Sequence, residues 1–125
     1  AKLLAALKKG GITGILPDQC PDKNSGEISA FLGCEALTMT LVYGLISRTD
    51  CSVLTGVAER VDGGFVFRFA EPNVGVYSSE RATSLLGMNR SVEACVERCP
   101  AQYQWEYKRF KYTGDTDSRP YQFKK

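Results

Sequence analysis

The chain has 125 residues, 43% of them apolar and 24% charged, and a formal net charge of +2. This length suits one domain with one core. The near-balance of charge gives no reason to expect a nucleic-acid partner, and no apolar run reaches the roughly 20 residues that span a bilayer.

Histidine is absent from the sequence. No Ser-His-Asp, Cys-His or His-carboxylate machinery can therefore form within these residues. The five cysteines are odd in number and include no Cys-x2-Cys pair, so we expect reduced, structural thiols and neither a metal site nor a cofactor.

An aspartate and a glutamine follow the first apolar stretch. Residues 12–16 (Ile-Thr-Gly-Ile-Leu) predict a short buried strand, and Pro17 would end it because proline has no N–H to donate. Asp18 and Gln19 would then emerge at the carboxyl end of a strand, where open α/β sheets bind ligands. They could hydrogen-bond a hydroxyl-rich ligand, or they could be the solvated side chains of a Pro-Asp turn.

The periodicity of apolar residues predicts the remaining elements. We expect helices over residues 1–9, 35–48 and 80–99, and strands over residues 12–16, 28–32, 52–60 and 64–71. The fold class is then α/β, a small mixed sheet flanked by helices. In the helix predicted from residue 35, Thr38 and Thr40 lie in the first turns. There they could bond a ligand or bond back to the helix.

A row of phenylalanines marks the last predicted strand. Phe65, Phe67 and Phe69 alternate with other residues and so share one face. We interpret this row as core rather than as a binding surface.

Aromatic and basic residues interleave from Pro100 to Tyr112. This mixture suits nucleic-acid stacking or a membrane interface, where Trp and Tyr lie at headgroup level and Lys and Arg meet phosphates. Alternatively, the segment is an amphipathic helix that packs Tyr103, Trp105 and Phe110 onto the sheet. We expect one domain over residues 1–113, followed by a disordered polar tail over residues 114–125.

Several short motifs, in this order, resemble those of the lipid A biosynthesis acyltransferases of Gram-negative bacteria. They are Gly14-Ile15-Leu16-Pro17-Asp18-Gln19, Phe31-Leu32-Gly33, Ala36-Leu37-Thr38-Met39-Thr40, Pro100-x-Gln102-Tyr103-x-Trp105 and Lys108-Arg109-Phe110-Lys111. The resemblance covers roughly residues 1–113.

The resemblance implies an enzyme with a glycerolipid-acyltransferase-like fold. This family moves a fatty acyl chain from acyl carrier protein to a hydroxyl of a lipid A precursor, at the cytoplasmic face of the inner membrane. Its His-x4-Asp/Glu motif supplies the general base. Because this chain has no histidine, it resembles the C-terminal half of such an enzyme, and we expect it to be inactive alone. A non-catalytic lipid- or membrane-binding module, or an acyltransferase for another glycolipid or a lysophospholipid, are the alternatives.

The same resemblance suggests substrate-binding roles for seven residues. Asp18, supported by Gln19, would accept hydrogen bonds from the acceptor sugar or orient the active-site network, and Thr38 and Thr40 would line the same cleft. Lys108, Arg109 and Lys111 would meet phosphates of lipid A or of phospholipid headgroups. The sequence departs from the family at Cys20, where an acidic residue is common, and at Cys34 and Glu35, where a basic residue and a proline are more usual.

Overall fold

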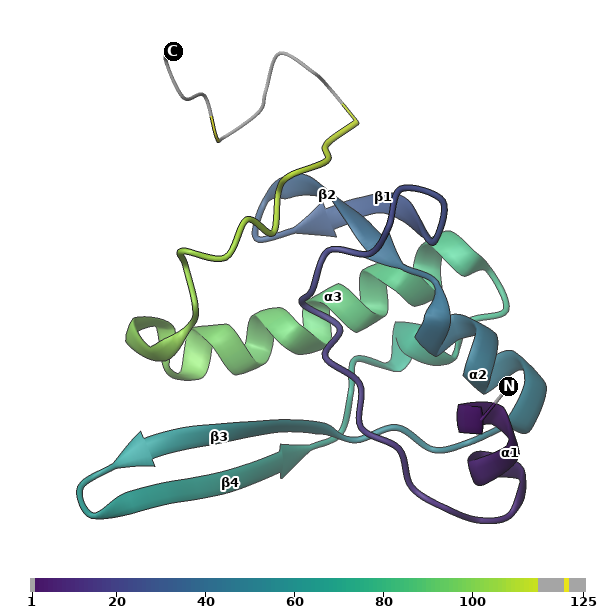
Figure 1. Cartoon of the computed structure of the whole chain (residues 1–125), viewed down its shortest axis with the longest axis horizontal. Helices are drawn as coiled ribbons and strands as arrows, with labels where there is room; N and C mark the ends of the chain where they lie inside the picture. The colour runs from purple at the N-terminus through teal and green to yellow at the C-terminus, as the bar shows by residue number, and fades with distance from the viewer. Residues whose placement is uncertain (1, 115–120, 122–125) are drawn as a thin grey trace.

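The computed structural model describes residues 2–114 and Tyr121, and its elements confirm the α/β class (Figure 1). They are α1 (Lys2–Lys8), β1 (Gly26–Phe31), β2 (Cys34–Met39), α2 (Leu41–Thr49), β3 (Thr55–Val61), β4 (Gly64–Ala70), the 3-10 turn η1 (Val74–Tyr77), α3 (Arg81–Arg98) and the 3-10 turn η2 (Pro100–Gln102). The predicted tail over residues 114–125 lies, apart from Gly114 and Tyr121, outside the described residues.

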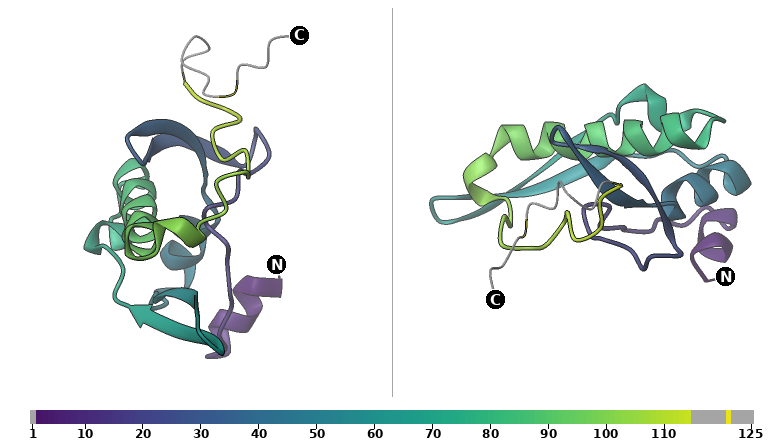
Figure 2. Two further views of the ribbon diagram at one scale, coloured as in Figure 1. Left: turned by 90° about the vertical axis from the view of Figure 1, so that its left-hand side faces the viewer. Right: turned by 90° about the horizontal axis from the view of Figure 1, so that it is seen from above.

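Two antiparallel hairpins lie on opposite sides of α3 (Figure 2). Strands β1 and β2 form one hairpin, and β3 and β4 form the other. The core gathers along α3, where Leu85, Met88 and Val96 are buried together with Phe31 and Leu37 of the first hairpin. No helix in the described part of the chain has the length and apolarity to cross a bilayer.

Polar side chains of α3 hold the first hairpin in place. The Asn89 amide donates to the Ala30 carbonyl (2.8 Å), and the Leu32 backbone N–H donates to the Glu93 carboxylate (2.7 Å). Asn89 and Glu93 are almost fully buried. Because unpaired buried polar groups are costly, these bonds fix how the helix and the hairpin meet.

The strand predicted over residues 12–16 does not form. In the described structure this stretch is irregular, pairs with no strand, and leaves Ile12 97% and Leu16 64% exposed. The apolar pattern was therefore misleading as to secondary structure, since a strand exists only where a neighbouring strand bonds its backbone. The predicted single mixed sheet is accordingly replaced by two antiparallel hairpins.

The helix predicted over residues 35–48 is wrong in its first third. Residues 34–39 form β2, and α2 begins only at Leu41. Leu32 and Gly33 both have positive φ angles (48° and 77°), as a tight two-residue hairpin turn requires. That turn folds β2 back on β1, so Leu37 belongs to a strand although its spacing fits the later leucines.

The phenylalanine row is exposed, so its interpretation as core is wrong. Phe65, Phe67 and Phe69 are 60%, 70% and 70% exposed. Helix α3 contacts the opposite face of the hairpin, along which Val57 and Arg68 lie. Only one face of a two-stranded ribbon can meet a single helix, and the row lies on the other.

Gly87 lets α3 approach η1 closely and does not split the helix. A Cβ atom at Gly87 would lie 2.4 Å from the Val76 nitrogen and 2.5 Å from the Gly75 carbonyl carbon. These are backbone atoms, which cannot swing aside as a flexible side chain can. Glycine is therefore required for this contact.

We predict that Gly87→Ala lowers the free energy of unfolding by about 1–3 kcal/mol, because the methyl group forces η1 away from α3. Thermal or urea unfolding measures this loss. Gly44→Ala is the matched control, because a Cβ at Gly44 in α2 meets nothing within 4 Å. It should raise stability by up to about 1 kcal/mol. Equal effects of the two substitutions would contradict the close-approach argument.

Candidate functional site

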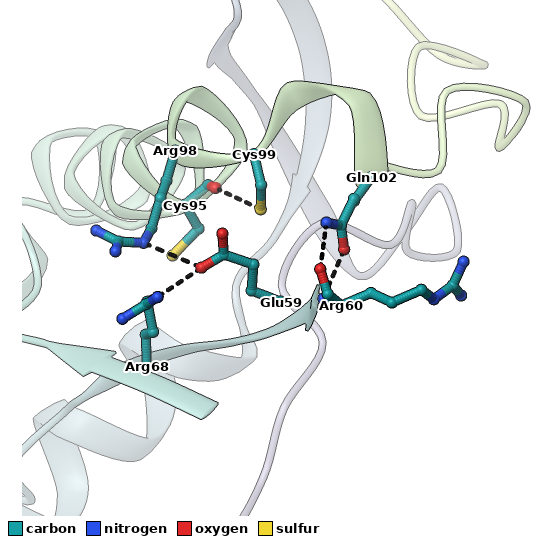
Figure 3. A network of polar contacts seen from close by, with 7 residues as sticks. All are labelled: Glu59, Arg60, Arg68, Cys95, Arg98, Cys99 and Gln102. Atoms are coloured by element: carbon teal, nitrogen blue, oxygen red, sulfur yellow. Dashed lines mark hydrogen bonds and ion pairs between the residues drawn. The ribbon is translucent and has the colours of Figure 1, made fainter. Parts of the chain in front are cut away.

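The segment after α3, residues 100–112, fastens the two hairpins to each other. At one end, the Gln102 side chain accepts a hydrogen bond from the Arg60 N–H (2.7 Å) and donates one to the Arg60 carbonyl (2.9 Å) (Figure 3). The amide thus bonds the backbone of β3 as a neighbouring strand would. At the other end, the Leu37 N–H of β2 donates to the Tyr112 carbonyl (3.0 Å). The amphipathic helix, one of the alternatives considered for this segment, does not form, since residues 103–112 are irregular.

Arg109 is the centre of this segment and is only 1% exposed. Its Nη1 donates to the Leu37 carbonyl (2.6 Å) and its Nη2 to the Thr38 hydroxyl oxygen (3.1 Å). Thr38 also accepts from the Asn89 amide (3.0 Å) and donates its hydroxyl proton to the Ala36 carbonyl (3.1 Å). We call Arg109, Thr38 and Asn89 the Arg109 cluster.

Polar and aromatic neighbours stabilise the positive charge of Arg109. The guanidinium carbon lies 5.0 Å from the centre of the Phe31 ring, a favourable cation–π distance. Burial lowers the pKa of Arg109, while the nearby Cys20, Tyr103 and Asp18 raise it. Its buried Nε atom has no hydrogen-bond partner among the described residues.

Aromatic rings complete the packing around Arg109. Phe31 meets Tyr103 edge-on (ring centres 6.5 Å apart) and Phe110 at 6.0 Å, and Tyr103 meets Trp105 at 4.8 Å. Burial raises the pKa of Tyr103 to about 12, and the negative charge of Asp18 adds to this shift. Asp18 therefore lies close enough to this ring cluster to affect it electrostatically.

The stretch that carries Asp18 is held against the C-terminal segment. The Cys20 N–H donates to the Tyr107 hydroxyl oxygen (2.8 Å). Burial raises the pKa of the Cys20 thiol, while the positive charges of Arg109 and Lys111 lower it. Asp18 is half-buried and Gln19 is exposed.

An open depression lies between these two stretches, with a volume of about 620 Å³. We call it the lysine depression, because Lys23, Lys108 and Lys111 line it. The Lys23 and Lys111 ammonium groups lie 4.9 and 5.2 Å from the centre of the Tyr112 ring. The other lining residues are Cys20, Pro21, Asp22, Gln104, Glu106, Tyr107 and Tyr112. The three lysines outnumber the two carboxylates, and two of the ammonium groups lie over an aromatic ring. This suits an anionic ligand that also carries sugar or apolar parts.

Six of the seven predicted site residues fall into three places, and the seventh, Gln19, is exposed beside Asp18. Asp18, Thr38 and Arg109 gather around the Arg109 cluster, whereas Lys108 and Lys111 line the lysine depression. Thr40 lies apart from both, at the start of α2, where its N–H and hydroxyl meet the Ser25 carbonyl at 3.3 and 3.5 Å. Because Arg109 is buried, the accessible cations are the lysines.

Sequence reasoning missed Lys23, Asn89 and Gln102 as members of these networks. Lys23 belongs to a polar loop far from Tyr112 in the sequence, and only the folded chain brings the two together. Asn89 on the helix stripe was a usable signal, because an amide among Leu85, Met88 and Val92 predicts a buried partner. Gln102 was noticed only as part of a motif.

A second network joins α3 to the β3–β4 hairpin, which we call the outer hairpin. The Glu59 carboxylate lies 2.5 Å from Arg68 Nε and 3.6 Å from Arg98 Nε (Figure 3). The hydrogen bond from Arg68 is the main cause of the lowered pKa of Glu59. A groove of about 400 Å³ lies beside this network, but the arginines are engaged by carboxylates of the chain itself. We therefore interpret this network as structural.

The described residues contain no cluster of three side chains that could hold a metal ion. Fold and site thus define a small α/β module with a buried arginine and a lysine-lined surface depression.

Comparison with known proteins gives the family. Residues 1–112 match the family described as "Bacterial lipid A biosynthesis acyltransferase". The chain is 26% identical over 111 residues to the lipid A biosynthesis palmitoleoyltransferase of Escherichia coli K12, and 27% identical over 112 residues to the lipid A biosynthesis lauroyltransferase of the same strain. The chain belongs to the bacterial lipid A biosynthesis acyltransferase family.

The matches cover 87% of this chain but only 36% and 37% of the two relatives. A lipid A biosynthesis acyltransferase of Shigella flexneri gives the same coverage as the palmitoleoyltransferase. The chain therefore spans little more than a third of the length of these relatives.

We predict that Thr38→Val lowers the free energy of unfolding by about 1–3 kcal/mol, because Asn89 and Arg109 each lose a buried acceptor. Urea unfolding measures the change. Thr83→Val, at an exposed position of α3, is the control and should stay within about 0.5 kcal/mol of the unsubstituted chain. A Thr38→Val protein as stable as its parent would rule out this role for the hydroxyl.

The raised pKa of Tyr103 predicts a loss of stability at alkaline pH. An unfolded tyrosine titrates near pH 10, whereas the folded pKa is about 12. The folded chain keeps the phenol proton that the unfolded chain releases between these values. The free energy of unfolding should therefore fall as pH rises through this window. Urea unfolding from pH 9 to 12 should show a shallower fall for Tyr103→Phe; parallel curves would contradict the shift.

Proposed function

We propose that this chain forms the acceptor-binding part of an acyltransferase that moves a fatty acyl chain from acyl carrier protein to a hydroxyl of a lipid A precursor. The observation that carries the proposal is the lysine depression, in a chain whose family acts in lipid A biosynthesis. Phosphate groups on a sugar lipid would meet lysines there, and the sugar could lie on the tyrosine rings.

The lysines and the Arg109 cluster would have different roles. Lys23, Lys108 and Lys111 would bind acceptor phosphates directly. Arg109 and Thr38 would act as positioning residues that hold the C-terminal segment against the first hairpin. Asp18, half-buried beside Tyr103 and Arg109, would accept a hydrogen bond from an acceptor hydroxyl or orient its neighbours, with Gln19 in support.

The general base would come from outside these 125 residues. The sequence contains no histidine, so the His-x4-Asp/Glu motif implied by the resemblance would be supplied by another stretch of polypeptide. Residues 1–125 alone would then bind an acceptor without acylating it.

The acceptor site would work at a membrane surface, at the cytoplasmic face of the inner membrane. Trp105, 53% exposed, and the exposed Lys108 and Lys111 belong to one short segment. Indole rings favour the headgroup level of a bilayer, and ammonium groups are attracted to lipid phosphates. Thr40 would contribute only indirectly, by fixing the start of α2 beside the Ser25 loop.

A lysophospholipid acceptor is the alternative that the same chemistry allows. Both classes of acceptor present phosphate and hydroxyl groups, and an arrangement of lysines does not choose between them. A panel of acceptors does: lipid A precursors, their dephosphorylated forms and lysophospholipids, each with the same acyl donor.

We predict that Lys111→Ala, in the full gene product that contains this chain, raises the KM for the phosphorylated acceptor roughly fivefold to tenfold. The value of kcat should change little, because the lysine binds the phosphate and does not touch the reacting atoms. Acyl transfer to the phosphorylated and the dephosphorylated acceptor measures both constants. The KM for the dephosphorylated acceptor should be unaffected.

Lys9→Ala is the matched control, since Lys9 is an exposed lysine that follows α1 and does not line the depression. If Lys111→Ala and Lys9→Ala both leave the KM unchanged, the phosphate-binding role is lost. Asp18→Asn in the same assay tests the acceptor side of the cleft, and unchanged turnover would remove Asp18 from the proposal.

A further inference from the structure

Three large apolar side chains are exposed together on the outer face of the β3–β4 hairpin, the face turned away from α3. This face carries Phe65, Phe67 and Phe69, paired across the strands with Arg60, Ala58 and Gly56. A phenylalanine side chain offers roughly 150–250 Å², so at 60–70% exposure the three rings present on the order of 300–500 Å². The largest apolar patch on a monomer is typically of this size and is often functional.

The face is stepped, and one of its rings already packs against the neighbouring strand. The Phe69 ring leans over Gly56, since a Cβ there would lie 3.0 Å from the ring. The Arg60 guanidinium lies 5.8 Å from the centre of the Phe65 ring, at the end of the row near the turn. Small residues on β3 beside large rings on β4 make a step into which another side chain layer can pack.

We propose that an apolar protein segment carrying a carboxylate covers this face, so that the hairpin is packed on both of its faces. Helix α3 already lies against the opposite face, through its contacts with β3 (Figure 1). Among the described residues, β3 and β4 pair with no strand other than each other, and a lone two-stranded ribbon is marginally stable in water.

The source of the segment is polypeptide that corresponds to the unmatched part of the family's length. Almost all of this chain matches the family, yet it accounts for only 36–37% of the relatives' length. The relatives thus contain ample further chain to cover the face. Such packing requires neither the proposed acceptor nor the proposed reaction.

A bilayer and a second copy fit the face less well. Asp62 and Glu71 lie just beyond the two ends of β4, so the row cannot enter a lipid surface without bringing carboxylates to the phosphates. In a two-fold pair, the face would meet itself. Among the six paired residues of this face, only Arg60 is charged. In such a pair, Arg60 would therefore meet no carboxylate on the opposing face.

Thiol labelling tests whether the face is covered. Ala58→Cys places a thiol on the outer face opposite Phe67, and Asp62→Cys places one at the exposed turn as the control. The protein is purified as its source cell makes it, in detergent and at submicromolar concentration. Alkylation at each position is followed by peptide mass spectrometry relative to the urea-unfolded protein, with the exposed Cys34 as an internal reference.

We expect Ala58→Cys to be alkylated at least about tenfold more slowly in the folded than in the unfolded protein, and Asp62→Cys to be slowed far less. Similar rates at the two positions would overturn the proposal. Protection that vanishes on dilution would assign the cover to a second copy, and protection present only in membranes would assign it to lipid; both results overturn it. Adding Phe67→Ser to the Ala58→Cys protein should, if the double variant folds, raise the reactivity of the introduced thiol.

Discussion

The buried guanidinium of Arg109 is the interaction on which the arrangement of this chain depends. It ties a segment that follows the last helix to Leu37 and Thr38 of the first hairpin, and Asn89 of α3 bonds the same threonine. A charge in a low-dielectric site is tolerated only when acceptors and aromatic faces surround it. The cost of leaving these groups unpaired is what makes the arrangement specific, and it keeps the lysines of the neighbouring turns in one place.

Helix α3 is the second organising element, because it meets both hairpins with different chemistry. Toward the first hairpin it presents buried amide and carboxylate groups, and toward the second it presents the arginine that shares Glu59 with Arg68. Gly87 brings η1 against the same helix. A single helix thus fixes the positions of two hairpins that do not pair with each other.

The lysine depression, where we propose that the acceptor binds, and the phenylalanine face, on the side of the β3–β4 hairpin away from α3, share no residue. The two surfaces differ in kind. One has ammonium groups that remain hydrated until an anion arrives, and the other has rings whose exposure to water is unfavourable. The first suits a ligand that comes and goes, and the second a permanent cover.

The sequence by itself determined the helices near residues 1–9 and 80–99, the second hairpin with its Asp62-Gly63 turn, and the family, because these depend on local periodicity, turn residues and short motifs. It did not determine the pairing of residues 34–39, the exposure of Phe67 or the burial of Arg109. Those depend on which surfaces meet in three dimensions. A strand pattern is realised only where a partner strand lies, an apolar row is core only where something covers it, and an arginine in a basic motif is buried only where acceptors from distant segments converge on it.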